Sequence, residues 1–371
     1  MSTDEVESTY SRRTKRWKLI VLLLLLALFV VVLVSLNVGY EPISFTDILK
    51  ILGKQIPILN GYVDSSLAAL SPKELITFQT NAGIILQLRL PRIIAGIVVG
   101  AALAASGVVY QGVFKNPMAD SYVLGVSAGA AVGASFSILF GAGLTFLGLS
   151  LVQVAAFIGA LFAMFLVYNI SRVGSRVPVT TLLLCGIAVN FFLYAIVALL
   201  EVIAGDELHA IVFWLIGGFS NVLWGDVWAV LPFIIIGTVI SYLYARDLNL
   251  LALGEDQAQH LGVNVERVKQ ALLVLASMVT AAAVSLSGLI GFVGLMVPHI
   301  TRLVIGPDHR ILFPASTIVG AIFLVICDAV ARVITTPFAS TSELPVGIVT
   351  MLAGAPFFII LFRKKKQSYA L

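Results

Sequence analysis

Four ionisable residues of opposite charge lie at the ends of long apolar stretches. Arg89 and Arg92 stand at the start of one stretch, and Asp328 and Arg332 stand near the end of another. A guanidinium group suits bidentate contacts that fix the geometry of a bound carboxylate. Asp328 and Arg332 are four residues apart, so on a helix they face the same side and can form an ion pair. These residues therefore offer charge recognition, either within the chain or toward an acidic partner.

Residues that would support catalysis or metal binding are dispersed. A metal site needs several His, Cys or carboxylate ligands close together, and a nucleotide-binding loop needs the pattern G-x-x-x-x-G-K-[ST]. The sequence contains no such loop, no clustered nucleophile and no paired acids. We therefore expect no catalytic residue, no metal site and no cofactor bound by this chain. The histidines occupy four separate segments, at His209, His260, His299 and His309.

A polar segment, residues 246–268, has the pattern of a short amphipathic helix. Gly254 interrupts it, the acids Glu255 and Asp256 that follow favour a helix N-terminus, and Gly262 suits a helix C-cap. The acidic start disfavours an anionic membrane surface, so the apolar face is better suited to a groove in a protein partner. That face consists of Leu250, Leu253, Ala258 and Leu261.

The elements that must position these residues are membrane spans. The chain is 60% hydrophobic and 11% charged, with a mean hydropathy of +1.05, whereas a soluble chain carries roughly a quarter charged residues. Apolar runs near the 20 residues needed to cross a bilayer recur along nearly the whole sequence. We predict an all-α polytopic membrane protein with ten spans. The expected spans are 18–38, 92–113, 122–140, 145–170, 179–203, 225–245, 270–290, 292–304, 311–333 and 345–362.

The distribution of Lys and Arg predicts the orientation. Basic residues precede the first apolar run and follow the last, and excess Lys and Arg mark the cytoplasmic side. Both termini are therefore expected in the cytoplasm. The domains expected are a basic tail at 1–17, one transmembrane domain at 18–362 and a tail at 363–371. Within the domain, 38–91 is expected outside, 246–268 is expected inside, and the eighth span is too short to cross unbroken.

The order of motifs resembles that of the FecCD-type permeases, which import vitamin B12, haem and iron–siderophore complexes. Segment 246–262 is similar to the family's coupling loop, and the likeness extends over about residues 85–362. Segment 39–84 is longer and less typical. The other matching segments are 89–92, 100–107, 115–120, 124–129, 291–302, 308–310, 343–347 and 354–357.

The resemblance implies a fold like the type II ABC importer permease and a set of partners. These are cytoplasmic ABC ATPase subunits, an external substrate-binding protein and a second permease copy, all in a cell membrane and without nucleic acid. ATP and Mg would bind the ATPase, so this chain would be a transport subunit and not an enzyme.

The resemblance also implies roles for particular residues. Arg89, Arg92 and Arg332 would dock the binding protein, although interfacial anchoring, or for Arg332 an ion pair with Asp328, is the alternative. The inner gate would include Asn116, Pro117, Thr180 and Thr181, and the alternative is that these residues form ordinary helix-entry turns. Contacts with the ATPase would come from Arg246, Leu253, Gly254, Glu255, Ala258, Leu261 and Gly262.

The expected cargo is an iron(III)–siderophore complex, with haem and cobalamin as alternatives. An ion-coupled secondary transporter is the alternative from another class, and it normally places ionisable groups at mid-membrane. Asp328 and Glu201 are the candidates for that role, and both lie near the ends of expected spans. The sequence therefore favours the ATP-driven importer.

Overall fold

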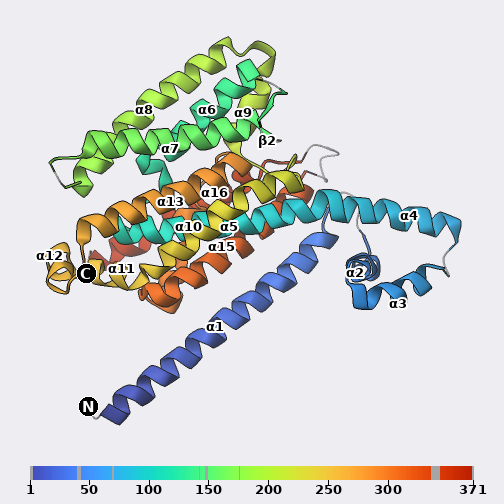
Figure 1. The fold of residues 1–371 in the computed structure, drawn as a ribbon, viewed down its shortest axis with the longest axis horizontal. Helices are drawn as coiled ribbons and strands as arrows, with labels where there is room; N and C mark the ends of the chain where they lie inside the picture. The colour runs from blue at the N-terminus through green and yellow to red at the C-terminus, as the bar shows by residue number, and fades with distance from the viewer. Residues whose placement is uncertain are drawn as a thin grey trace.

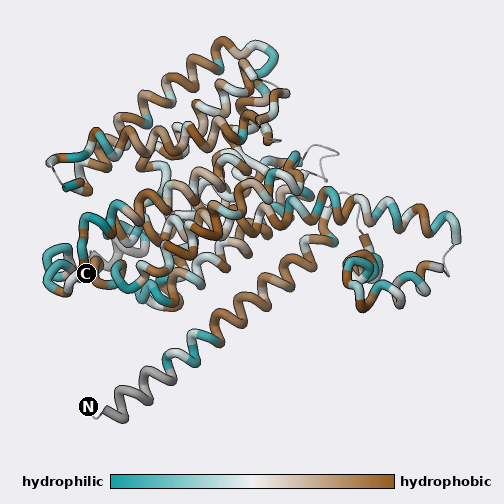
Figure 2. Tube along the Cα trace, viewed as in Figure 1, coloured by the Kyte–Doolittle hydropathy of each residue, from teal (hydrophilic) through white to brown (hydrophobic). Residues whose placement is uncertain are grey.

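The computed structural model describes residues 3–39, 43–68, 71–141, 143–146, 149–174, 176–335 and 343–369. These residues form an all-helical bundle with one small hairpin, in which strand β1 (Thr145–Phe146) pairs antiparallel with β2 (Leu149–Ser150). The two termini lie at the same end of the bundle (Figure 1). Apolar residues cover the middle of the long helices, and polar residues gather toward both ends (Figure 2). The ends of the expected tails, residues 1–2 and 370–371, lie outside the described ranges.

Seven described helical segments are long and apolar enough to cross a membrane, and three more apolar helices are shorter. Each of the ten expected spans overlaps one of them, so the all-helical, polytopic prediction is confirmed. The long segments are 13–37 of α1 (Thr3–Asn37), Pro72–Phe114, α7 (Leu151–Ser171), α8 (Val179–Ile203), α10 (Trp224–Leu243), α13 (Val265–Ser287) and α15 (His309–Val333). The shorter apolar stretches are α6 (Val126–Gly141), α14 (Val293–Ile305) and Val346–Leu361, the apolar part of α16 (Val346–Tyr369).

Several expected boundaries are displaced. The expected tails are helical where they are described, because α1 begins at Thr3 and α16 continues to Tyr369. The fourth span begins at Leu151 and not at 145, because strands β1 and β2 precede it. The seventh span begins at Val265, where Asn264 caps α13 by accepting the backbone N–H of Arg267 at 3.2 Å. A helix therefore begins next to its polar capping residue, several residues before the apolar run starts.

Helix α5 (Leu90–Phe114) forms the centre of the bundle. In its most apolar window 83% of the residues are buried, and it packs against α10, α13, α14 and α15. Glycines allow these close approaches. A Cβ at Gly100 would overlap the carbonyl of Gly320, and a Cβ at Gly107 would overlap the carbonyl of Gly294. Small residues thus bring membrane helices to backbone contact within one chain.

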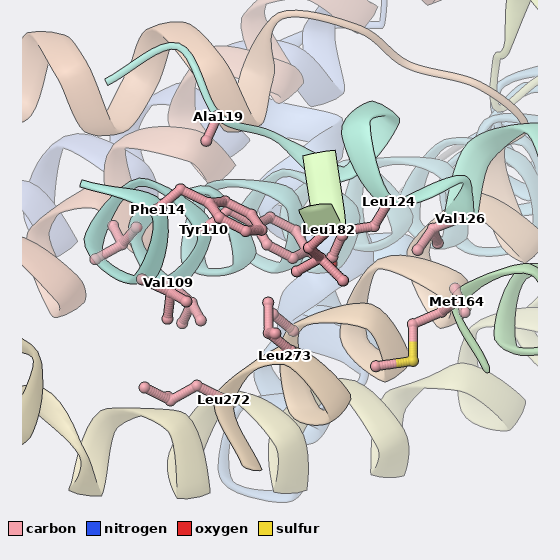
Figure 3. Close-up of a cluster of buried hydrophobic side chains, with 14 of the residues drawn as sticks. Val109, Tyr110, Phe114, Ala119, Leu124, Val126, Met164, Leu182, Leu272 and Leu273 are labelled. Atoms are coloured by element: carbon pink, nitrogen blue, oxygen red, sulfur yellow. The ribbon is translucent and has the colours of Figure 1, made fainter. Parts of the chain in front are cut away.

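Helices α6, α7 and α8 form a second group beside this centre (Figure 1). A cluster of buried apolar side chains joins the two groups, with Tyr110 and Phe114 of α5 facing Leu182 of α8 and Leu273 of α13 (Figure 3). The 3-10 turn η2 (Ser121–Leu124) links α5 to α6 and contributes Leu124 to the same cluster. This cluster fixes the C-terminal end of α5 against the start of α8.

Three helices, here called the insert, lie in the segment to which the sequence analysis assigned no helix. It comprises α2 (Phe45–Lys54), α3 (Pro57–Ala68) and α4 (Pro72–Gly83), and it lies at the end of the bundle opposite the termini (Figure 1). Ser71 and Glu74 form a capping box that starts α4. The second span is therefore not an isolated helix beginning at 92. It continues from α4 through a π-helical turn, η1 (Ile84–Arg89), into α5.

Two interrupted elements lie between the long helices. Helix α14 begins beside the middle of α5, after Phe292 in a left-handed conformation, which agrees with the expected broken eighth span. Helix α9 (Leu208–Ile216) is followed by Gly218, whose N–H donates to the carbonyl of Ser287 at 2.8 Å. The segment after α9 is thus bonded to the end of α13. A Cβ at Gly347 would overlap the carbonyl of Ile216, so the start of α16 packs closely against the end of α9.

Candidate functional site

The three arginines proposed for docking converge at the end of the bundle that carries the insert. Arg89 comes from η1, Arg92 from the first turn of α5 and Arg332 from the last turn of α15. Each is buried, with exposed fractions of 7%, 7% and 5%. They border a cavity of about 660 Å³ between the end of α1, η1 and the loop before α10. From the sequence, only Asp328 and Arg332 were expected to lie next to each other. The fold places Arg89 and Arg92 beside them.

Asp328 lies at the centre of this arginine cluster. Its Oδ1 accepts a hydrogen bond from Nε of Arg92 at 2.8 Å, and its Oδ2 lies 3.2 Å from Nε of Arg332. Arg92 also pairs with Glu343, whose side chain is 37% exposed. Among the described side chains, Asp328 is therefore shared by Arg92 and Arg332, and Arg92 is shared by Asp328 and Glu343. The ion pair of Arg332 with Asp328, which the sequence offered as an alternative, is present.

Two of these arginines hold the outer end of α1. Arg89 donates to the carbonyl of Leu36 at 2.8 Å, and Arg332 donates to the carbonyls of Val38 at 2.7 Å and Ser35 at 3.1 Å. The last carbonyls of a helix have no partner within the helix and carry partial negative charge, so cations stabilise them. The arginine cluster thus joins α1, α5 and α15, whether or not it also binds a partner.

A second cavity lies next to the arginine cluster, at the end of the bundle opposite the termini. Its volume is about 530 Å³, and it shares Glu343 and the segment 220–222 with the first cavity. Sequence reasoning missed it because its walls come from six separated parts of the chain. Its polar lining residues include Ser150, Gln153, His209, Asp226, Ser285 and Ser287. The end of the bundle opposite the termini therefore offers a broad hollow with polar residues in its lining instead of a tight site with convergent ligands.

The proposed coupling segment forms two short helices at the end that carries the termini. They are α11 (Ala245–Leu253) and α12 (Glu255–His260), and they meet at Gly254, whose φ of 134° suits glycine. Ala258 is fully buried, whereas Leu253 and Leu261 are 59% and 61% exposed. Arg246 is also exposed, and Gly262 follows α12 with a φ of 90°. The expected break and end are therefore present, and two leucines face outward.

The side chain of Glu255 forms an ion pair with a buried lysine. Nζ of Lys269 lies 3.2 Å from Glu255 and 2.9 Å from Glu266, and its side chain is only 6% exposed. Glu266 in turn accepts the backbone N–H of Val177 at 3.3 Å. This chain of contacts connects α12 to Val177, two residues before the start of α8. Lys269 was not among the predicted site residues. In the sequence it is simply a lysine next to the start of an expected apolar span.

The residues proposed for the inner gate lie in two separate turns. Lys115 ends α5 in a left-handed conformation, and Asn116 accepts the N–H of Met118 at 2.9 Å. Pro117 is half-buried, while Thr180 is exposed and Thr181 half-buried in the first turn of α8. Among the described residues no hydrogen bond joins Asn116 to either threonine. The two turns are connected instead through the apolar side chains around the end of α5 and the start of α8.

The part of the chain that the structure describes holds no group of three His, Cys, Asp or Glu side chains that could bind a metal ion. His299 packs near Phe357 and Phe358 of α16. His309 bonds through its Nδ1 to Asn249 at 2.8 Å. These two histidines therefore take part in helix packing.

Comparisons with known proteins give a consistent family. Residues 25–364 match the profile of the FecCD transport family. The cobalamin import system permease protein BtuC of Halobacterium salinarum is 43% identical, covering 96% of this chain and 98% of its own length. The hemin transport system permease protein HmuU of Yersinia pestis is 40% identical, covering 76% and 84%.

A solved structure also resembles this fold. It is described as an inward-facing conformation of a metal-chelate type ABC transporter and has a TM-score of 0.76 at 31% identity. The match covers 93% of this chain and 99% of that chain. The sequence profile, the relatives and the fold agree over nearly the whole length. The chain therefore belongs to the FecCD transport family, as a multi-pass membrane permease of an ABC importer.

Proposed function

We propose that this permease imports cobalamin. The observation that carries the proposal is the match to the Halobacterium salinarum cobalamin permease, which is 43% identical over 96% of this chain, whereas the Fe(3+)-citrate permease YfmD of Bacillus subtilis covers the same share at 33% identity. Such coverage must include most of the insert at 44–83, whereas the match to the hemin permease leaves about a quarter of the chain outside. The sequence led us to expect an iron(III)–siderophore complex. That cargo remains the second candidate, because the iron(3+)-hydroxamate permease FhuB of Bacillus subtilis is 39% identical.

The shape of the outer cavities supports a bulky cargo delivered by another protein. A permease of an ABC importer works with an ATPase and a binding protein, and the cavities here lack a tight set of ligands. Selectivity would then reside mainly in the binding protein. Arg89, Arg92 and Arg332 would dock its carboxylates at the rim of the arginine cluster, beside the half-exposed carboxylate of Glu343.

The cytoplasmic end supports coupling to the ATPase. Leu253 and Leu261 present two exposed apolar side chains that suit a groove in that subunit. The contacts from Glu255 through Lys269 and Glu266 would transmit movement of α12 to the start of α8. Thr180 lies there, and a second permease copy would complete the inner gate around it.

The test is cargo uptake into liposomes that contain the permease, its ATPase and its binding protein. Cobalamin, haem and ferric siderophores are compared with and without ATP. We expect ATP-dependent uptake of cobalamin, and its loss when Leu253 and Leu261 are both changed to Ser. Leu243→Ser, at a 70% exposed position on α10, is the matched control.

Two results would contradict the proposal. Uptake of a siderophore or haem in preference to cobalamin would reassign the cargo while keeping the importer. Uptake that needs no ATP and follows an ion gradient would remove the importer itself, and Asp328 would then become the leading coupling residue.

A further inference from the structure

A groove between the first membrane helix and α14 is not used by the transport pathway described above. It lies at the end of the bundle that carries the termini and has a volume of about 590 Å³. Helix α14 contributes two aliphatic side chains, and α1 contributes the rest. The lining residues are Arg13, Arg16, Trp17, Ile20, Leu23, Leu24, Val304 and Ile305.

The chemistry of the groove changes in order along α1. The lining residues recur every three or four positions, so they form one stripe of the helix. Two guanidinium groups come first, an indole follows, and aliphatic side chains continue toward the middle of the membrane. Trp is typical of the boundary between headgroups and hydrocarbon. Lys15 and Lys18, which have the same charge, lie on the opposite side of the helix and do not line the groove.

Contacts with the turn before α15 fix the polar end of the groove. Arg13 pairs with Asp308 at 3.0 Å, and Arg310 pairs with the same carboxylate at 2.7 Å. The indole of Trp17 lies between these arginines, with its centroid 4.7 Å from the guanidinium carbon of Arg13 and 5.2 Å from that of Arg310. Arg16 forms no ion pair with any described side chain. Arg13 and Arg310 thus share the carboxylate of Asp308, and the guanidinium group of Arg16 lies beside them in the groove.

The groove opens toward the surrounding bilayer. Only 11% of the most apolar window of α1 is buried within the chain, and Val304 is 77% exposed. A small anion could satisfy the arginines but would leave the aliphatic wall uncovered. An amphipathic molecule with an anionic head satisfies both parts, and basic pockets between membrane helices on the cytoplasmic side suit such lipids. We propose that this groove binds an anionic phospholipid of the cytoplasmic leaflet, with its phosphate at Arg13 and Arg16.

The site also contacts the coupling region. Asp308, which pairs with Arg13, accepts a hydrogen bond from Asn249 of α11 at 2.8 Å. A phosphate at Arg13 would share that guanidinium with Asp308 and so act on the turn to which α11 is bonded. Lipid composition would then influence the coupling helices without contact with the cargo.

The test measures lipid binding to the purified permease, without cargo or binding protein, so its outcome is independent of the proposed cargo. Permease from nanodiscs of phosphatidylglycerol and phosphatidylcholine is analysed by native mass spectrometry. We expect retained phosphatidylglycerol, and about a fivefold loss in Arg16→Gln, because one basic residue near a membrane surface contributes that much to anionic lipid affinity. Lys18→Gln removes the same charge from the opposite face and should retain the lipid.

Three outcomes would overturn the inference. Equal loss in Arg16→Gln and Lys18→Gln would indicate general surface attraction without a site. Equal retention of phosphatidylcholine would remove the role of the anionic head. Displacement of the lipid by inorganic phosphate alone would show that the aliphatic wall contributes nothing.

Discussion

The arginine cluster predicts a large effect for one uncharged replacement, Asp328→Asn. The side chain of Asp328 is 1% exposed and those of Arg92 and Arg332 are 9% and 3% exposed, so the two guanidinium groups would remain buried without their shared counterion. Removing one partner of a buried charge pair costs about 3–5 kcal/mol. At 1.4 kcal/mol for each factor of ten, the ratio of folded to unfolded permease would fall by about two to four orders of magnitude.

The assay is SDS titration of the purified permease in detergent, with unfolding followed by tryptophan fluorescence. Glu343→Gln is the matched control, because Glu343 also pairs with Arg92 but its side chain is 37% exposed. An exposed pair contributes about 1 kcal/mol or less, so this variant should lose little free energy of unfolding. If Asp328→Asn costs no more than Glu343→Gln, the carboxylate is not the counterion that holds the cluster, and the reasoning fails.

Three further predictions concern other parts of the chain. Gly107→Ala should destabilise the permease by about 1–3 kcal/mol in the same titration, because the new Cβ overlaps the carbonyl of Gly294, whereas Gly83→Ala has open space and should stabilise it slightly. Lys269→Met should lower cargo uptake per ATP by about tenfold, since a buried charge-assisted bond contributes about 1.5–3 kcal/mol; Lys269→Arg should restore coupling, and unchanged coupling in Lys269→Met would refute the link to α8. The hydrogen bond from Arg310 holds the pKa of Asp308 well below its usual value, so its stabilising contribution is present above that usual value and is lost as pH falls. Melting temperatures of the parent and Asp308→Asn should therefore differ by a constant amount from pH 8 to 5 and converge in stronger acid, and convergence at neutral pH would contradict this account.

The spans and the coupling segment could be predicted because their signals are local. A run of apolar residues predicts a membrane helix. The glycines at 254 and 262 mark a helix break and a helix end, whatever α11 and α12 pack against. The pair of Asp328 with Arg332 was visible for the same reason, since both lie on one helix turn.

The remaining parts of the site depend on contacts between distant segments. Arg92 and Asp328 are 236 residues apart, and no spacing rule connects them. Lys269 gave only the signal of one charge at a helix start, and its partners follow from where α12 folds back. The insert was missed because its helices are short, and the buried side chains of α2 and α4 pack against α1 and η1, which are distant in the sequence pattern.

The unbroken run from α4 through η1 into α5 has a mechanical consequence. Its 43 residues correspond to a rod of about 64 Å, roughly twice the thickness of the hydrocarbon core. The inner half is clamped among α10, α13, α14 and α15, and the outer half projects beyond the bundle. Such a rod is a lever with its fulcrum at Arg89 and Arg92. A push on the insert from outside would therefore arrive as torque at the most deeply packed helix of the molecule.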